Sequence, residues 1–260
     1  MKKILTVLFS SLLLILLSDY SFAAKASYEG YKKCGGCHKS QKDSWLETKH
    51  ANAFENLKPN KEAEAKKKAK LDPKKDYTSD EKCVGCHVTG YKQTKGYSER
   101  MSKTAAKYYT GVGCEECHGP GSLYRKDHRS ASRKFKNTKE ASQRSPLLKK
   151  GQVLEFEEEC NRCHMNYEGS PWKNAKEPYT PFTPDIDKKY KFDYEKAVKE
   201  SGKDKAMHEH FKLRGVFTGK PVSKFREEFQ KGAKEPAEPE EDEGDEGDGG
   251  DEEGGGEDGE

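Results

Sequence analysis

Cys34-Gly35-Gly36-Cys37-His38 is the first of four segments in which two Cys, three positions apart, are followed directly by a His. The second, third and fourth motifs are Cys83-Val84-Gly85-Cys86-His87, Cys114-Glu115-Glu116-Cys117-His118 and Cys160-Asn161-Arg162-Cys163-His164. The spacing places both sulfurs on one side of a helical turn, where they can form thioethers with the two vinyl groups of a haem. The adjacent His then faces the iron as its proximal ligand. We therefore predict four covalently bound haem c groups.

Zinc sites and disulfide bonds are the competing interpretations of paired Cys. Zinc would use the Cys pairs, but it does not require a His directly after each of them. Disulfides are typical of exported proteins, yet they leave the four adjacent His unexplained as well. The motifs use all eight Cys of the chain, which favours haem attachment over both alternatives.

The composition agrees with an interior built from haem. Of the 260 residues, 37% are charged and only 31% are apolar, which by itself resembles a disordered chain. The 13 Tyr and 11 Phe would be out of place in a solvated coil. These numbers argue against an α/β enzyme with a large aliphatic core and against a polytopic membrane protein. We predict a mainly α, loop-rich multihaem cytochrome c whose four haems form much of the core.

The chain divides into three segments. Residues 1–23, with Lys2 and Lys3 followed by the apolar run Ile4–Leu17, are typical of a signal peptide cleaved after Ala23. An uncleaved N-terminal anchor is the alternative. Residues 24–234 form the predicted tetrahaem domain, and residues 235–260 form a disordered, acidic, Gly-rich tail. No other segment is apolar enough to cross a membrane, so we expect a periplasmic protein without a transmembrane segment in its mature form.

The charges are distributed unequally along the chain. The tail carries fifteen acidic residues and no basic one, while the whole chain has a net charge of only +3. The tetrahaem domain therefore has an excess of more than fifteen basic residues. A basic surface steers encounter with an acidic partner. Nucleic acid could use the same charge, but the compartment argues against it. The tail either keeps the protein solvated or screens and docks the basic domain.

The local patterns predict helices separated by irregular chain. We expect a helix over residues 39–57, with Trp45 and Leu57 on one apolar face, and a solvated helix over Lys61–Leu71. Two further helices are expected over Gly151–Glu159 and Asp204–Leu213. Residues 89–113 are predicted to be irregular, residues 119–150 are weakly patterned, and the Pro-rich residues 171–184 should be extended or turning. No segment shows a convincing strand pattern.

The eight His allow a count of iron ligands. Four are proximal, namely His38, His87, His118 and His164, and four remain, namely His50, His128, His208 and His210. His50 lies on the apolar face of its expected helix, where an unpaired imidazole would be costly to bury. The last two His are two residues apart on different faces of one helix, so only one of them can easily reach an iron. We expect three bis-His haems and one haem with an empty or weakly occupied sixth position. Met101, Met165 and Met207 are alternative sixth ligands, although Met more often serves in packing.

Several longer runs carry a resemblance to one family. The chain resembles the tetrahaem cytochrome c-554 family, which accepts electrons from hydroxylamine oxidoreductase in ammonia-oxidising bacteria. The resemblance covers roughly residues 29–230 and includes Glu29-Gly30-Tyr31-Lys32-Lys33-Cys34, Thr110-Gly111-Val112-Gly113-Cys114, Asp127-His128-Arg129, Asn166-Tyr167-Glu168-Gly169-Ser170-Pro171-Trp172, Tyr179-Thr180-Pro181-Phe182-Thr183-Pro184 and Met207-His208-Glu209-His210. The long acidic tail is a departure from the family pattern.

The resemblance implies a specific set of ligands. Three haems would be bis-His and low-spin, and the haem at Cys83, Cys86 and His87 would be five-coordinate and high-spin. The distal ligands would be His128 for the first haem, His208 for the third and His50 for the fourth, with His210 not a ligand. A Thr-Pro-Phe segment, here Thr180, Pro181 and Phe182, would cover the open haem face. Without the resemblance, the same three residues would be an extended loop over a haem edge.

The resemblance also implies a function. The protein would carry electrons from hydroxylamine oxidoreductase to a membrane-associated c-type cytochrome and the quinone pool during ammonia oxidation. The alternative is an enzyme that reduces nitric oxide at the five-coordinate haem. The sequence shows no C-x-x-C-K site and no obvious acid–base set beside the second motif, which favours the electron carrier.

Overall fold

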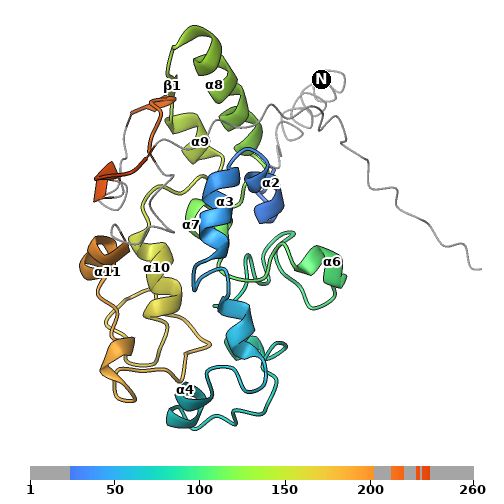
Figure 1. The fold of residues 1–260 in the computed structure, drawn as a ribbon, viewed down its shortest axis with the longest axis vertical. Helices are drawn as coiled ribbons and strands as arrows, with labels where there is room; N and C mark the ends of the chain where they lie inside the picture. Colours follow the sequence, from blue (N-terminus) through green and yellow to red (C-terminus); the bar gives the residue numbers. More distant parts are fainter. Residues whose placement is uncertain (1–23, 202–211, 220–226, 229, 235–260) are drawn as a thin grey trace, which may run out of the picture.

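The computed structural model describes residues 24–201, 212–219, 227–228 and 230–234. The expected signal peptide (1–23), the acidic tail (235–260), and His208 and His210 with most of the helix expected over Asp204–Leu213 lie outside the described residues. Short helices joined by long irregular segments make up an elongated body, with α8 near one end and α4 near the other (Figure 1). The prediction of a mainly α, loop-rich fold is therefore confirmed.

The described elements are brief. In chain order they are α2 (Tyr31–Gly35), α3 (Lys39–Leu46), η1 (Ala53–Leu57), α4 (Ala63–Lys68), α5 (Glu81–Val84), α6 (Lys103–Ala106), α7 (Cys114–His118), α8 (Arg125–Thr138), β1 (Ser142–Gln143), α9 (Ser145–Lys149), α10 (Glu157–His164), η2 (Lys188–Tyr190), α11 (Tyr194–Ser201) and β2 (Phe217–Thr218). Each of the four motifs overlaps a helix: the first α2, the second α5, the third α7 and the fourth α10. Each motif is therefore presented by a helix of its own, while the other described helices carry no motif.

The continuous helix expected over residues 39–57 is wrong. The chain forms α3, turns, and then forms the 3₁₀ helix η1. Polar side chains end α3: the Thr48 hydroxyl donates to the Trp45 carbonyl (2.7 Å), and the Asn52 amide donates to the Leu46 carbonyl (3.1 Å). Because the helix breaks, Leu46 is 42% exposed, while Trp45 and Leu57 are buried.

Two other helix predictions need correction. The helix expected over Lys61–Leu71 is the shorter α4, and it is not fully solvated, because Lys66 is only 3% exposed. The helix expected over Gly151–Glu159 is also wrong, since α10 begins only at Glu157 and contains the fourth motif itself. Three Glu occupy the first turn of α10, where they complement the positive end of the helix dipole.

The segment 119–150 is more regular than its sequence pattern suggests. It contains α8 and α9, and between them β1 pairs in parallel with β2, with Ser142 opposite Phe217. Arg144, which is 6% exposed, holds this pair by donating to the Gly219 carbonyl (2.8 Å). The sequence did not predict these strands, because two residues are too few to show alternation.

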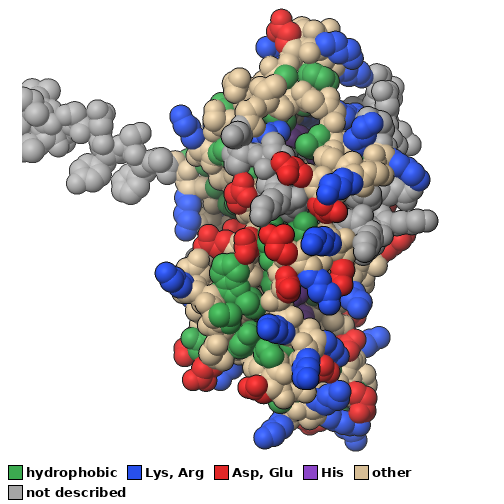
Figure 2. Space-filling view, turned by 90° about the vertical axis from the view of Figure 1, so that its left-hand side faces the viewer, with side chains coloured by type: hydrophobic (Ala, Val, Ile, Leu, Met, Phe, Trp, Pro, Cys, Tyr) green, Lys and Arg blue, Asp and Glu red, His purple; other side chains and the backbone are tan. Residues whose placement is uncertain are grey.

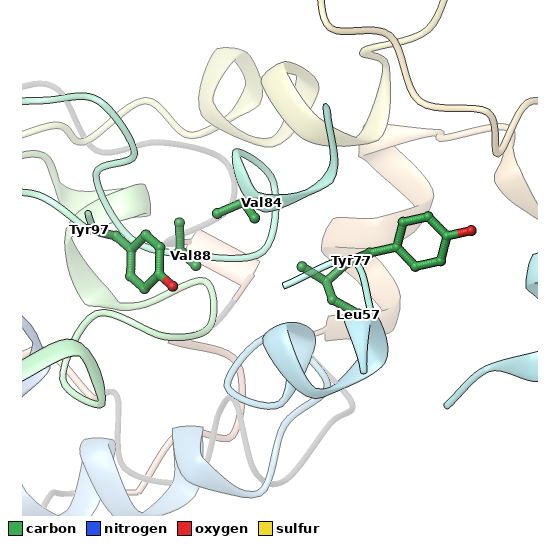
Figure 3. Packing of buried hydrophobic residues seen from close by; sticks show 5 residues of the cluster. All are labelled: Leu57, Tyr77, Val84, Val88 and Tyr97. Carbon is green, nitrogen blue, oxygen red and sulfur yellow. The ribbon is translucent and has the colours of Figure 1, made fainter. Parts of the chain in front are cut away.

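The irregular segments follow the expectation more closely. Residues 171–184 contain no helix or strand, and residues 89–113 contain only the short helix α6 and one bridge between Val88 and Thr110. A small cluster of buried side chains lies beside the second motif and is formed by Leu57, Tyr77, Val84, Val88 and Tyr97 (Figure 3). In the described part of the chain, every helix is too short or too polar to span a bilayer.

Candidate haem sites

The four motifs lie next to one another in a definite order. The Cys34 side chain of the first motif lies close to that of Cys114 in the third. The Cys163 side chain of the fourth motif lies equally close to that of Cys86 in the second. Helix α7 packs against both α2 and α10. The order in space is therefore first, third, fourth and second.

Two pairs of His face each other at the separation that an iron atom requires. The ring centroids of His38 and His128 are 5.8 Å apart, and those of His50 and His164 are 6.0 Å apart. Metal–nitrogen bonds to imidazole are about 2 Å long, so an iron between two imidazoles places the ring centres roughly 6 Å apart. The described residues therefore fit two bis-His haems, one at the first motif and one at the fourth.

The electrostatics of these rings suit ligation. Loss of solvating water lowers the pKa of His38, His50 and His164, the last to about 4. The Arg214 charge lowers the pKa of His38 further, and His50 does the same for His164. The neutral imidazole is the form that binds a metal. Neighbouring protein atoms displace much of the water around these rings, yet each of the three residues keeps solvent-accessible surface on which a haem could lie.

Helix α8 and strand β2 bring His128 to the first motif. Arg125, in the first turn of α8, donates from Nε and Nη2 to the two carboxylate oxygens of Glu29 at 2.6 and 3.1 Å. Glu29 lies two residues before α2, so this ion pair ties the helix of His128 to the helix of the first motif. The Phe217 ring of β2 packs against His128, with centroids 5.1 Å apart.

His50 is placed by the chain that precedes the third motif. Its carbonyl accepts a hydrogen bond from the Val112 amide (2.9 Å), and the Val112 carbonyl accepts one from the Trp45 indole (2.9 Å). On the other side of the pair, the Phe192 ring stacks on His164 with centroids 4.5 Å apart.

The second motif has a different environment. The Nδ1 atom of His87 lies 2.6 Å from the Ala53 carbonyl oxygen, which orients the ring and leaves Nε2 for a metal. Burial lowers the pKa of His87, which keeps the imidazole neutral. Among the described residues, no second His ring stands opposite His87 as it does for His38 and His164.

A cavity of about 390 Å³ lies beside the second motif. Its lining includes Cys83 and Tyr77 on one side and Thr180 and Pro181 on the other. Phe182 does not line it, because its ring packs against Tyr190 with centroids 5.4 Å apart. The structure thus brings two of the three residues of the expected covering segment to this cavity and turns the third away from it.

Asn166 anchors that covering segment just after the fourth motif. Its carbonyl accepts a hydrogen bond from the Thr180 amide (2.7 Å), and its side-chain amide donates to the Pro178 carbonyl (2.7 Å). The Thr180 hydroxyl in turn accepts from the Phe182 amide (3.1 Å).

The third motif is described only on its proximal side. The His118 ring meets Phe156 edge-on, with centroids 5.5 Å apart. The expected partner, His208, lies outside the described residues, as does His210, so its placement stays a prediction.

Sequence reasoning missed the aromatic residues that pack on the ligand rings. Phe156, Phe192 and Phe217 belong to three separate segments, and no periodic pattern singles them out. It also assigned no role to Glu115 and Glu116 within the third motif. Their position, as two acidic residues between the Cys of a haem-attachment motif, is the sequence feature that could have identified them.

The fold and the motifs together define the class of protein. Among the described residues, no group of three or more His, Cys, Asp or Glu is arranged to hold a metal ion by itself. Paired Cys at helical turns, each pair followed directly by a His, are the elements of a multihaem c-type cytochrome.

Comparison with known proteins specifies the family. A family model described as cytochrome c554 and c-prime matches residues 33–119. The cytochrome c-554 of Nitrosomonas europaea is 55% identical over 227 residues, which cover 87% of this chain and 94% of that protein. The structure of reduced cytochrome c554 from Nitrosomonas europaea is 56% identical and matches with a TM-score of 0.76, covering 82% of this chain and 99% of that chain. This chain belongs to the cytochrome c-554 family, as its sequence runs predicted.

Proposed function

We propose that this chain is a periplasmic tetrahaem carrier that takes electrons from hydroxylamine oxidoreductase and passes them to a membrane-associated c-type cytochrome. Its membership of a family of multihaem electron carriers, with a relative from an ammonia-oxidising bacterium, supports this role. When bound, each haem supplies one-electron chemistry at its iron. The residues of the chain hold the four groups and set their order.

The proposed ligands follow the geometry where it is described. His38 and His128 would hold the first iron, and His164 and His50 would hold the fourth. His118 would hold the third iron with His208, and His87 would hold the second from one side only. The protein then has three bis-His haems and one five-coordinate haem.

The single observation that carries the proposal is the continuity of the four motifs. Cys34 contacts Cys114, α7 packs against α10, and Cys163 contacts Cys86. Neighbouring attachment sites therefore form one continuous series. A catalyst with one active haem would not require such a series, whereas a carrier does.

The surface charge supports steering toward an acidic partner over part of the molecule. On the face in Figure 2, Lys and Arg side chains are spread widely, and a band of acidic side chains crosses the middle with hydrophobic side chains below it. Docking on this face would therefore combine separated basic areas with the hydrophobic area below the acidic band. Charge steering raises the encounter rate more than the affinity.

Stopped-flow reduction of the mature holoprotein by hydroxylamine oxidoreductase tests the carrier. We expect reduction of all four haems at a rate that falls steeply with added salt. The variant without residues 235–260 separates the tail from the domain, and it should keep the haem spectrum. Absence of reduction by the oxidoreductase would contradict the proposal. A reduction rate that does not depend on ionic strength would contradict electrostatic steering.

The cavity beside Cys83 favours a second candidate function, the reduction of nitric oxide at the second haem. Its lining contains Asp80, Lys82 and Glu168, which could supply protons. Turnover of nitric oxide by the reduced protein, compared with the rate of electron exchange with the oxidoreductase, decides between the two. We expect exchange to be the faster process.

A further inference from the structure

The two residues between the Cys of the third motif are both acidic, and they point to different parts of the molecule. Glu115 is 1% exposed, and Glu116 is half-buried. The corresponding pairs in the other motifs are Gly35-Gly36, Val84-Gly85 and Asn161-Arg162. Only the third motif therefore carries carboxylates at these positions. The inference drawn from them rests on the proposed function, because it concerns the placement of the haems.

Glu115 connects the third motif to the first. Its carboxylate accepts hydrogen bonds from the amides of Glu29 (3.0 and 3.1 Å), Gly30 (2.8 Å) and Gly121 (2.7 Å). Gly30 immediately precedes α2 and has a φ of 76°, a conformation that favours glycine. The three donors are backbone groups, so Glu115 fixes the path of two chain segments.

The same connection reaches the helix of His128. Gly121 lies four residues before α8 and donates to Glu115, while Glu29 forms its ion pair with Arg125 at the start of that helix. Glu115 thus lies where the proximal helix of the first motif, the third motif and the distal helix of the first haem meet.

Glu116 connects the third motif to the other two. Its carboxylate accepts a hydrogen bond from the Gly90 amide (2.5 Å), three residues after His87 of the second motif. It also lies 3.4 Å from Nη2 of Arg162, inside the fourth motif, and the same Nη2 donates to the Glu116 carbonyl (3.3 Å). Arg162 in turn pairs with Glu159 in α10.

We propose that Glu115 and Glu116 are positioning residues that make the third motif the central support of the four haems. Glu115 sets the first and third haems relative to each other, and Glu116 sets the second and fourth relative to the third. Both residues also place a carboxyl group between the two Cys of a haem-attachment motif. A nearby negative charge disfavours the addition of an electron.

Three variants test the proposal in the four-haem holoprotein. Glu115→Gln and Glu116→Gln keep the shape but replace one acceptor oxygen with an amide that cannot accept the backbone hydrogen bonds. Glu115→Asp keeps the charge and shortens the reach. Glu64→Gln, at an exposed position in α4, is the matched control. The readout is a reductive titration followed by electron paramagnetic resonance, in which the five-coordinate haem has its own high-spin signal.

The two Gln variants should change different signals. We expect Glu115→Gln to raise the potentials and shift the g values of low-spin haems while the high-spin signal titrates as in wild type. Glu116→Gln should move the titration of the high-spin signal to a higher potential. Glu115→Asp should shift the g values with a smaller change in potential, and Glu64→Gln should change neither.

Different experimental results would contradict the positioning role of the two Glu and the proposed function. Holoprotein variants with four haems and wild-type titrations would overturn the positioning role, and so would two Gln variants that alter the same signals. A wild-type protein without a distinct high-spin signal would instead contradict the proposed ligand set. If Glu115→Gln does not mature, wild-type g values in Glu115→Asp would still overturn the role of Glu115.

Discussion

The surroundings of the first and second motifs differ in what stands opposite the proximal His. At the first motif, His128 faces His38 from α8, and an ion pair between Glu29 and Arg125 holds that helix in place. At the second motif, a cavity beside Cys83 is lined by Thr180 and Pro181. The comparison teaches that the same attachment motif can have different surroundings, because the segment that packs beside it comes from a distant part of the chain.

The two regions also differ in buried charge. Beside the first and third motifs lies Glu115, whose pKa is raised by burial. Near the second motif lies Lys66, which donates to the Lys58 carbonyl (2.7 Å) and lies 5.4 Å from the centre of the Tyr77 ring. Burial lowers the pKa of Lys66, while Asp76 acts in the opposite direction. A buried carboxylate disfavours reduction of a neighbouring iron, and a buried ammonium favours it.

Removing the distal His of the first region should make it resemble the second. We expect His128→Ala to convert one low-spin haem to high spin, so that the high-spin share rises from about one haem in four to about two in four. Electron paramagnetic resonance of the oxidised protein measures the change. His208→Ala should have the same effect and His210→Ala none, and the reverse result for these two would contradict the assignment of the third haem.

Opening the covering segment should sharpen the difference in ligand access. Pro181→Gly removes a ring from the cavity wall, and we expect nitric oxide to enter the reduced protein roughly tenfold faster, equivalent to about 1.4 kcal/mol. Flash photolysis measures the rate. Phe182→Ala should have a smaller effect, since that ring packs on Tyr190. A larger effect for Phe182→Ala would show that the ring covers the iron.

Replacing the buried ammonium should act on the second region alone. We expect Lys66→Met to lower the potential of the second haem by an amount on the order of 1 kcal/mol, because a cation that favours reduction is lost. A redox titration of the high-spin signal measures this shift. The control is Lys67→Met on the same helix, where the side chain is exposed. Equal shifts in both variants would contradict a specific role for Lys66.

The smallest expected effect concerns the cluster behind the cavity. The Tyr77 hydroxyl donates to the Asp72 carbonyl at 3.1 Å. Tyr77→Phe should reduce the free energy of unfolding by about 1 kcal/mol and leave the haem spectra unchanged. Chemical denaturation of the holoprotein measures the loss. Tyr97→Phe removes a hydroxyl from the same cluster and provides the comparison.

Much of the site could be predicted because it is encoded locally. The Cys and the proximal His of each motif are adjacent in sequence, so their chemistry needs no knowledge of the fold. Helix boundaries were less predictable: Thr48 and Asn52 end α3 with side-chain hydrogen bonds, although the apolar spacing continues to Leu57. Lys66 looked solvated in a Lys-rich run, and only its packing on Tyr77 shows that it is buried.

The sequence by itself determined the class of protein, the number of attachment motifs, the surplus of four His and the small share of aliphatic core. These properties follow from residue identity and short spacing. Only the tertiary structure decided that His128 faces His38, that His50 faces His164 and that the third motif lies between the first and the fourth. Such pairings join residues tens of positions apart. The chain segments that carry such residues are held by hydrogen bonds between side chains and distant backbone atoms, as at Glu115 and Asn166. A local sequence pattern does not predict these hydrogen bonds.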